Sequence, residues 1–477
     1  MVDFMEYDKD LRARQEARDC CRQALEAQKR LGTFSQEKLD EIVTAVATAF
    51  SAGAEELGRM AVAETGFGNA TDKATKNRFA SETVEQAIRG MKTVGILGED
   101  RERQVLEIGV PVGVIAAIVP STNPTSTICY KAMIALKAGN AIVFSPHPKA
   151  LRCSMTAAKL VAAAAERAGA PAGSVGCLSI PSMAGCQELM AAPEVRLLLA
   201  TGGPAMVKAA YSSGKPAIGV GAGNGPAYIH SSADVKTALE QILKSKTFDY
   251  GTVCASEQSI MVEASMEQTV RTTASQMGYY FMDEGEGQRL AKLLFRPNGA
   301  MNPDVVGKPA EHLANMAGIS VPAGTRILVG MAKDVGANHP YSNEKLCPVL
   351  GFFVLKDQDA VLEKATEVLH HEGAGHTFAI HAKERAVVEK FAKAIPVSRF
   401  LVNTPAALGG IGATTGLFPA LTLGCGAVGG SASSNNISPM DLVNIRRVAW
   451  GRGEENTPTP NEDLVALLTR KSLERLR

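Results

Sequence analysis

The sequence predicts an α/β fold of doubly wound parallel sheets, in which helices cover both faces of each sheet. From residue 113 onward, short apolar runs alternate with Ala-rich stretches such as MTAAKLVAAAAERAG. Strands buried on both faces are apolar throughout, and their alternation with helices indicates βαβ units. The runs are GVIAAIVP, NAIVFSP, GCLSI, RLLLATGG and PAIGVG.

The composition is that of a soluble globular protein with two or three domains. The chain has 477 residues, of which 45% are apolar and 21% charged. A formal net charge of +1 provides no basic field for nucleic acid, and aromatic residues, at 5%, leave few rings for base stacking. We therefore expect no nucleic-acid partner.

Cysteine usage and hydropathy indicate a cytoplasmic protein. The nine cysteines include no CxxC pair, and no His stands at zinc-ligand spacing, so we expect no metal site and a reducing compartment. The charged start, MVDFMEYDKDLRARQEARD, is unlike a secretory signal. The longest apolar run, near GVPVGVIAAIVP, is shorter than the ~20 residues of a membrane span, so we expect no membrane partner.

The first hundred residues are predicted to be helical. Ser35 can cap a helix there, because the apolar residues that follow it recur at the spacing of a single helix face. These residues are Leu39, Ile42, Val43, Val46 and Phe50. Such an apolar face requires a partner in the folded protein.

Loops of small or polar residues follow the predicted strands. Ligands of doubly wound sheets bind at the carboxyl ends of the strands. The loops at these ends are VPSTNP, FSPHP, ATGGPA and GVGAGNGP. The last of them lacks the GxGxxG spacing of the usual dinucleotide fingerprint.

A second α/β region is predicted from about residue 236, with VLGFFVL and RFLVNTP as strands. Near residue 405 the chain becomes Gly-rich, in NTPAALGGIGATTG and TLGCGAVGGSASSNN. Glycine permits tight turns and a close backbone approach, so this segment either lines a site or forms a surface loop. Composition leaves both interpretations open.

Cys254 lies in the stretch FDYGTVCASEQS, where no charged residue follows it until Glu257. Free cysteine is among the most buried residue types, so a buried thiol is the simple interpretation. The motifs around it decide otherwise.

Seven motifs, in order, resemble those of the CoA-acylating aldehyde dehydrogenases. They are VPSTNPTSTICYKAMIALKAGNAIVFSPHP, ATGGPAMVKAA, GVGAGNGPAYI, FDYGTVCASEQS, HPYSNEKLCPVLGFF, GAGHT and LVNTPAALGGIG. The resemblance covers roughly residues 5 to 450. It is nearest to the aldehyde half of bifunctional alcohol/aldehyde dehydrogenases and to the propionaldehyde dehydrogenases of bacterial microcompartments.

The resemblance implies two doubly wound α/β domains, one for the cofactor and one catalytic, plus a small oligomerisation arm. Residues 1–235 would form the N-terminal helices and the NAD-binding domain, with part of the arm near 102–112. Residues 236–427 would form the catalytic domain, 428–450 an oligomerisation segment, and 451–477 a linker with an amphipathic tail helix.

Three residues receive catalytic roles from the resemblance. Cys254 falls on the nucleophile, whose thiolate adds to the aldehyde; helix dipoles or a cation would lower its pKa from about 8.5. Asn123 falls on the amide that holds the developing oxyanion with the Cys254 backbone N–H. His376 resembles the histidine of the CoA half-reaction, where it could take the thiol proton of CoA. The alternatives are an Asn-Pro turn and a structural histidine.

The implied cofactor is NAD, with NADP left open, and CoA is the implied co-substrate. Glu344 would bind the nicotinamide-side ribose, although a solvated loop carboxylate is the alternative. The backbone at Thr201, Gly202 and Gly203 would approach the pyrophosphate. The other implied cofactor contacts are Ser121, Thr122, Ser145, Pro146, Gly221 and Leu346.

Two departures from hydrolytic aldehyde dehydrogenases indicate acyl transfer to CoA. Those enzymes carry a general-base glutamate in an ELGGK motif, where this chain has Gly219 or Val220. Without that base, water attacks the thioester slowly and the more nucleophilic thiol of CoA collects the acyl group. Hydrolytic relatives also place a lysine before a proline at the adenosine ribose, where this chain has Ser145.

The implied partners are a small aldehyde, CoA and further copies of the chain, as a dimer or tetramer built through RQVLEIG and DLVNIRRVAW. Residues 461–477 resemble the encapsulation peptides that recruit enzymes into a microcompartment shell; docking on the enzyme itself is the alternative. Acetaldehyde and propionaldehyde are the expected substrates, and sulfoacetaldehyde is the alternative. Two remoter possibilities are a cofactor-free thiol hydrolase using Cys254, His376 and Asn403, and an inactive scaffold.

Overall fold

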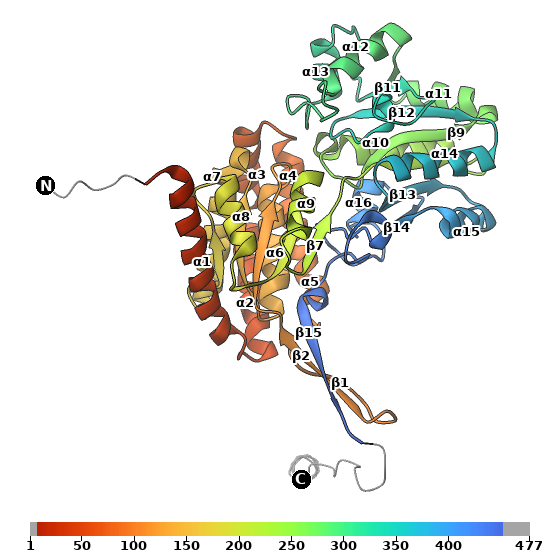
Figure 1. The fold of residues 1–477 in the computed structure, drawn as a ribbon. Helices are drawn as coiled ribbons and strands as arrows, with labels where there is room; N and C mark the ends of the chain where they lie inside the picture. Colours follow the sequence, from red (N-terminus) through yellow and green to blue (C-terminus); the bar gives the residue numbers. More distant parts are fainter. Residues whose placement is uncertain (1–6, 452–477) are drawn as a thin grey trace, which may run out of the picture.

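The chain forms two parallel α/β sheets and a projecting antiparallel arm (Figure 1). The structure is a computed structural model that describes residues 7–451. The predicted linker and tail helix therefore lie, apart from Gly451, outside the described residues. This architecture confirms the predicted fold class.

The N-terminal region is helical, as predicted. The Ser35 hydroxyl accepts a hydrogen bond from the Lys38 N–H at 3.3 Å, and the five apolar residues predicted for one face are all buried. The helices are α1 (Lys9–Leu31), α2 (Gln36–Ala52), α3 (Ala54–Thr65), α4 (Ala70–Arg78) and α5 (Val84–Ile88), with a π-helical turn at Phe79–Thr83.

The first sheet has five parallel strands in the order β5-β4-β3-β6-β7. They are β3 (Val114–Val119), β4 (Ala141–Pro146), β5 (Val175–Cys177), β6 (Val195–Thr201) and β7 (Ala217–Val220). Every residue of β3 is buried, and alternate side chains join two different apolar clusters. The sheet is therefore covered on both faces, which explains the continuous apolar runs.

A different set of helices covers each face of this sheet. α1 with α8 (Met183–Ala191) and α9 (Pro204–Tyr211) packs on one face. α2 with α6 (Pro124–Lys137) and α7 (Leu151–Arg167) packs on the other. The predicted apolar face of α2 thus finds its partner in α6, α7 and the sheet.

The second sheet has seven parallel strands in the order β10-β11-β12-β9-β8-β13-β14. They are β8 (Gly225–Ile229), β9 (Glu257–Glu263), β10 (Tyr279–Phe281), β11 (Ile327–Met331), β12 (Val349–Leu355), β13 (Gly375–His381) and β14 (Val397–Val402). One face packs on α10 (Val235–Thr247), α11 (Glu267–Ser275) and α16 (Ala406–Gly410). The other packs on α12 (Glu284–Leu294), α13 (Ala310–Met316), α14 (Gln358–His371) and α15 (Arg385–Ala394).

The chain enters the second sheet before the predicted boundary at residues 235 and 236. β8 already pairs with β9 and β13, so the crossing between sheets lies between residues 220 and 225. The sequence of a buried apolar strand looks the same in either sheet, and only its pairing partners show to which sheet it belongs.

The arm is a three-stranded antiparallel sheet that projects from the first domain (Figure 1). It joins β1 (Gly95–Asp100), β2 (Val105–Pro111) and β15 (Val443–Ala449), with Val443 opposite Pro111 and Ala449 opposite Val105. The two segments predicted for the arm are therefore neighbours, although more than 300 residues separate them in the chain.

The edges of the two large sheets face each other. The loops that follow β3, β4, β6 and β7 line the same cavity as the segment that precedes β9. The carboxyl edge of the first sheet thus meets the amino edge of the second. Within the described range, no helix has the length and apolar character of a membrane span.

The first residue of β13 provides a test of this packing. Gly375 has φ +78° and a Cβ there would lie 1.8 Å from the Cys425 carbonyl oxygen, whereas Gly214 has φ +79° and open space. We expect Gly375→Ala to lower the free energy of unfolding by about 3 kcal/mol or more, and Gly214→Ala by about 1 kcal/mol. Urea titration followed by far-ultraviolet circular dichroism measures both, and equal losses would contradict the close contact.

Candidate active site

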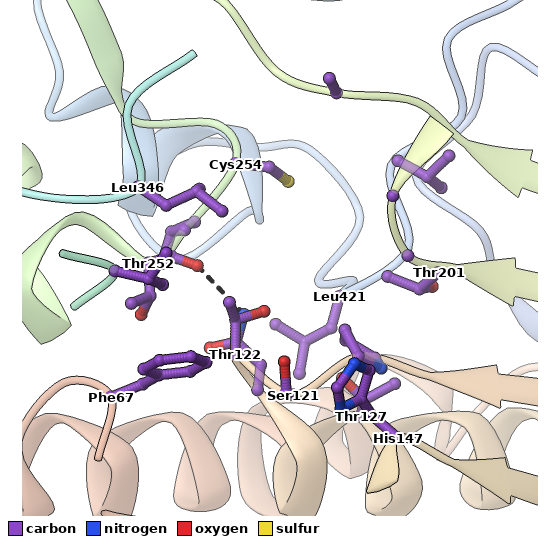
Figure 2. A pocket seen from close by; sticks show the side chains of 18 of the residues that line it. Phe67, Ser121, Thr122, Thr127, His147, Thr201, Thr252, Cys254, Leu346 and Leu421 are labelled. Carbon is purple, nitrogen blue, oxygen red and sulfur yellow. Dashed lines mark hydrogen bonds between the residues drawn. The ribbon is translucent and has the colours of Figure 1, made fainter. Parts of the chain in front are cut away.

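A cavity of about 420 Å³ lies between the two sheet edges. Figure 2 shows Cys254 and Leu346 on one side of it, with Ser121, Thr122 and His147 on the opposite side. The predicted site residues that line it are Ser121, Thr122, Asn123, Thr201, Gly202, Gly203, Gly221, Cys254, Glu344 and Leu346. Sequence positions scattered over more than 200 residues are thereby brought together.

Ser145 and Pro146 do not line the cavity. They are the last two residues of β4, and both are buried in the sheet. His147 and Lys149, just beyond the strand, line the cavity instead. The strand thus extends through Ser145 and Pro146, and the loop that reaches the cavity begins after them.

The thiol of Cys254 lies against His376. The Sγ of Cys254, three residues before β9, is 3.2 Å from Nε2 of His376, near the start of β13. Nδ1 of His376 is 2.8 Å from the hydroxyl of Thr377. If Nδ1 carries the hydrogen for that contact, Nε2 is free to accept a proton from the thiol. His376 is fully buried, so its orientation is fixed by packing.

Both members of this pair are neutral at rest. Burial, with a further contribution from Glu344, raises the pKa of Cys254 to about 12, and Arg399 opposes the rise. Burial, with the nearby charge of Arg399, lowers the pKa of His376 to about 3. This differs from the expected lowering of the thiol pKa, because burial disfavours the charged thiolate and the cation offsets only part of that cost.

Arg399 is a buried cation that the sequence motifs did not indicate. Its side chain is 2% exposed, and Nη2 donates to the carbonyl oxygens of Gly424 at 2.6 Å and Gly375 at 3.3 Å. Gly375 directly precedes His376, so the guanidinium holds the start of β13 in place. An arginine within the apolar strand VSRFLV was the available signal.

Asn123 is held by both domains. It occupies the cap position of α6, yet its side chain does not cap that helix. Its Nδ2 donates to the Thr252 carbonyl at 3.2 Å, and its Oδ1 accepts from Lys76 at 2.6 Å. The amide thus spans from the first domain to the loop that carries Cys254.

A buried ionic cluster lies beneath this amide, and sequence reasoning missed it. Oδ2 of Asp249 accepts from Lys76 at 2.6 Å, from Lys73 at 2.9 Å and from the Thr252 hydroxyl at 2.7 Å. Its Oδ1 accepts from the Asn69 N–H at 2.9 Å. The two lysines one turn apart in TDKATKN, and the aspartate in the motif FDYGTVC, were the only signals.

Among the described residues that line the cavity, Glu344 is the one with a carboxyl group. Its Oε1 accepts from the Gly223 N–H at 2.9 Å. Burial, with the neighbouring Glu372, raises the pKa of Glu344 to about 8, so this group is largely protonated at neutral pH. It therefore provides no ionised base beside the thiol. Gly219 and Val220 lack an ionisable side chain.

The first-sheet side of the cavity fits a dinucleotide. Thr201 ends β6, and its buried hydroxyl has no hydrogen-bond partner among the residues described. Gly203 caps α9, and a Cβ at Gly203 or Gly221 would meet nothing within 4 Å. A helix N-terminus with open backbone suits a phosphate group, and the unpaired hydroxyl supplies another polar contact.

The chain matches known proteins along nearly its whole length. The aldehyde dehydrogenase family model matches residues 9–286. Bifunctional aldehyde-alcohol dehydrogenase AdhE of Escherichia coli (strain K12) is 44% identical over 428 residues, which are 89% of this chain and 48% of that protein. The chain thus spans about half the length of this curated relative.

Two solved structures share the fold closely. An acetylating aldehyde dehydrogenase from Geobacillus thermoglucosidasius is 47% identical with a TM-score of 0.92, covering 95% of this chain and 100% of that one. A propionaldehyde dehydrogenase from Rhodopseudomonas palustris, with bound CoA and an acylated cysteine, is 30% identical with a TM-score of 0.81. That match covers 91% of this chain and 96% of the other.

The raised pKa of Cys254 predicts slow alkylation of the resting protein. Because only the thiolate reacts, and its pKa is about 12, the rate with iodoacetamide should rise about tenfold per pH unit from pH 7 to 9. Mass spectrometry of the peptide that contains Cys254 measures the rate, with Cys254→Ser as the blank. A plateau below pH 8 would instead indicate a thiolate–imidazolium pair with His376.

Proposed function

The chain belongs to the aldehyde dehydrogenase family, and on that premise we propose that it is a CoA-acylating member. It converts a short-chain aldehyde, CoA and NAD into acyl-CoA and NADH through a thioester on Cys254. The observation that carries this proposal is the 3.2 Å contact between Nε2 of the buried His376 and Sγ of Cys254, which lines the cavity where the two sheets meet.

In the first half-reaction, Cys254 is the nucleophile and His376 the base. The thiol proton passes to Nε2 of His376 while Sγ bonds to the aldehyde carbon. The carbonyl oxygen becomes an oxyanion, which accepts hydrogen bonds from Nδ2 of Asn123 and the Cys254 backbone N–H. Bound nicotinamide would supply the hydride acceptor. Loss of the hydride from the former aldehyde carbon re-forms the carbonyl and leaves an acyl thioester on Cys254.

In the second half-reaction, CoA takes the acyl group. His376 first releases to solvent the proton that it took from Cys254. The proton of the CoA thiol then passes to His376, and the CoA sulfur bonds to the thioester carbon. The bond between that carbon and Sγ of Cys254 then breaks, and the cysteine is reprotonated. His376 is neutral in the resting protein because of its burial, so it is available as an acceptor at neutral pH. The acylated cysteine seen with CoA in the Rhodopseudomonas palustris structure supports this route.

The cavity wall supports transfer to CoA rather than to water. The Glu344 carboxyl is engaged by Gly223 and is protonated at neutral pH, and Val220 is apolar. Water and the CoA thiol would share the neutral base His376, and the thiol, which is more acidic and more nucleophilic than water, would then react faster. The acetylating activity named for the Geobacillus thermoglucosidasius enzyme agrees with this assignment.

NAD and CoA would use the first-sheet side of the cavity. The Thr201 hydroxyl, the open backbone at Gly203 and the carboxyl of Glu344 would contact the dinucleotide. His147 and Lys149 would take the place expected for Ser145 and Pro146. NAD is the proposed nicotinamide cofactor, and a comparison of rates with NADP tests that choice.

The aldehyde is proposed to be acetaldehyde or propionaldehyde. The apolar side chains of Val253, Ile411 and Leu421 line the cavity with Cys254, which suits a short unbranched chain. Sulfoacetaldehyde is less favoured, because neither lysine of the cavity wall is proposed to face the aldehyde. Lys76 is engaged by Asp249 and Asn123, and Lys149 lies where the cofactor is proposed to bind.

A papain-like hydrolase is not assembled. Asn403 bonds to the backbone of Ala382 through both ends of its amide, at 3.0 and 2.8 Å. The Nδ1 of His376 is paired with Thr377 instead. The predicted chain order of Cys254, His376 and Asn403 therefore does not correspond to a triad in space.

The arm is proposed to join copies of the chain into a dimer or tetramer. Ile96, Ile445 and Val448 on its strands are more than one-third exposed, which is unusual for large apolar side chains on a projecting sheet. For localisation, we propose the cytoplasm, with residues 461–477 directing the enzyme into a microcompartment.

Strict dependence on CoA is the expected kinetic signature. NADH formation from acetaldehyde, propionaldehyde and sulfoacetaldehyde should require CoA beyond a single burst, and propionaldehyde or acetaldehyde should react fastest. Cys254→Ser should lower kcat/KM by at least about 10³-fold. Absorbance at the NADH band measures each rate. Equal turnover to free acid without CoA would contradict the proposed acyl transfer.

Deletion of residues 452–477 tests the targeting role. Turnover and oligomeric state should be unchanged, because the described catalytic residues all precede the deletion, while cosedimentation with assembled microcompartment shell protein should be lost. Turnover is measured by NADH absorbance and oligomeric state by light scattering. Loss of activity or of oligomerisation would show instead that the segment docks on the enzyme.

A further inference from the structure

We propose that Lys76 is a positioning residue that orients the Asn123 amide toward the developing oxyanion, an assignment that rests on the proposed acyl chemistry at Cys254. Lys76 lies on α4, in the helical region before the first sheet, and it touches Asn123 rather than the thiol. Its ammonium group connects the amide of Asn123 to the carboxylate of Asp249 below it.

The amide of Asn123 needs an external constraint. An asparagine at a helix cap usually accepts hydrogen bonds from its own helix, but this side chain makes no such bond. Its oxygen and nitrogen ends have nearly the same size, so rotation by 180° would present the oxygen to the substrate. A carbonyl oxygen facing an oxyanion repels it, so the orientation decides whether the amide helps or hinders.

Lys76 provides that constraint from the oxygen side. Its Nζ donates to Asn123 Oδ1 at 2.6 Å, to Asp249 Oδ2 at 2.6 Å and to the Thr252 hydroxyl at 3.1 Å. An ammonium group has three N–H bonds, and three acceptors use all of them. A flipped amide would place its NH₂ against this ammonium, with no acceptor between them. The oxygen is thereby kept away from the reacting carbonyl.

The buried charge strengthens the amide as a donor. The side chains of Lys76 and Asp249 are 3% and 0% exposed, so their fields are little screened by water. A charge-assisted hydrogen bond to the oxygen of an amide polarises its N–H groups. One N–H of Asn123 is used by the Thr252 carbonyl at 3.2 Å. The other makes a long contact of 3.4 Å with the Thr122 hydroxyl, which the oxyanion would replace.

Lys73 offers a matched control on the same helix. It lies one turn before Lys76, is also 3% exposed, and donates to the same carboxylate oxygen of Asp249 at 2.9 Å. Its other partner is the Thr122 carbonyl at 2.8 Å rather than the amide. Loss of either lysine removes one positive charge from the cluster, but only Lys76 contacts Asn123.

The test is a double-mutant cycle on the acylation of Cys254 by p-nitrophenyl acetate. In that step Sγ bonds to the acetyl carbon and p-nitrophenolate leaves, so the reaction uses the oxyanion donors without a nicotinamide or CoA. Asn123→Ala and Lys76→Met should each slow single-turnover release of p-nitrophenolate about 100-fold. The double variant should be no more than about 3-fold slower than the slower single variant. Independent, multiplying losses would overturn the proposal.

The controls separate orientation from folding. The rate losses caused by Lys73→Met and Asn123→Ala should multiply in the double variant, because Lys73 acts elsewhere in the cluster. Lys76→Gln keeps an N–H donor without charge and should react about tenfold faster than Lys76→Met. It also replaces Lys76→Met in the cycle if the methionine variant fails to fold. No recovery in a folded Lys76→Gln variant would overturn the proposal. If the wild-type protein neither acylates nor oxidises aldehydes, the proposed function itself fails.

Discussion

A buried carboxylate between two ammonium groups is the interaction on which the site depends. Asp249 starts a run of left-handed residues, with φ of 48°, 50° and 75° at residues 249–251, just before the segment that leads to Cys254. Lys73 and Lys76 hold that carboxylate from α4, and removing one partner of such a buried pair typically costs 3–5 kcal/mol, on the order of a third of a domain's stability. The strained loop therefore stays docked on the first domain.

This docking places Cys254, the proposed nucleophile, at the junction where the edges of the two sheets face each other. The first sheet contributes the carboxyl ends of its strands, with open loops and a helix N-terminus suited to a dinucleotide. The second sheet contributes the amino ends of β9 and β13, with Cys254 and His376. Neither sheet alone contains both a cofactor surface and a nucleophile, so the chemistry belongs to the junction.

Burial gives the reacting pair its character. A thiol and an imidazole in contact often exist as an ion pair, yet burial keeps both Cys254 and His376 neutral, with pKa values of about 12 and 3. In the proposed reaction, proton transfer would therefore be coupled to attack on the carbonyl, and fixed donors would receive its negative charge. Arg399, held by backbone carbonyls, supplies positive charge nearby without occupying the cavity.

Local patterns in the sequence predicted the parallel α/β architecture, the cap at Ser35, strands buried on both faces, and the set of loops that meet at Cys254. These features depend on the periodicity of apolar residues and on motifs whose residues are adjacent in the chain. Only the folded structure shows that β8 joins the second sheet, that His147 rather than Ser145 lines the cavity, and that Lys73, Lys76 and Arg399 lie buried near Asn123, Cys254 and His376. Pairing partners and buried charges are set by contacts between residues distant in the chain, and no local pattern encodes which charge a fold will enclose.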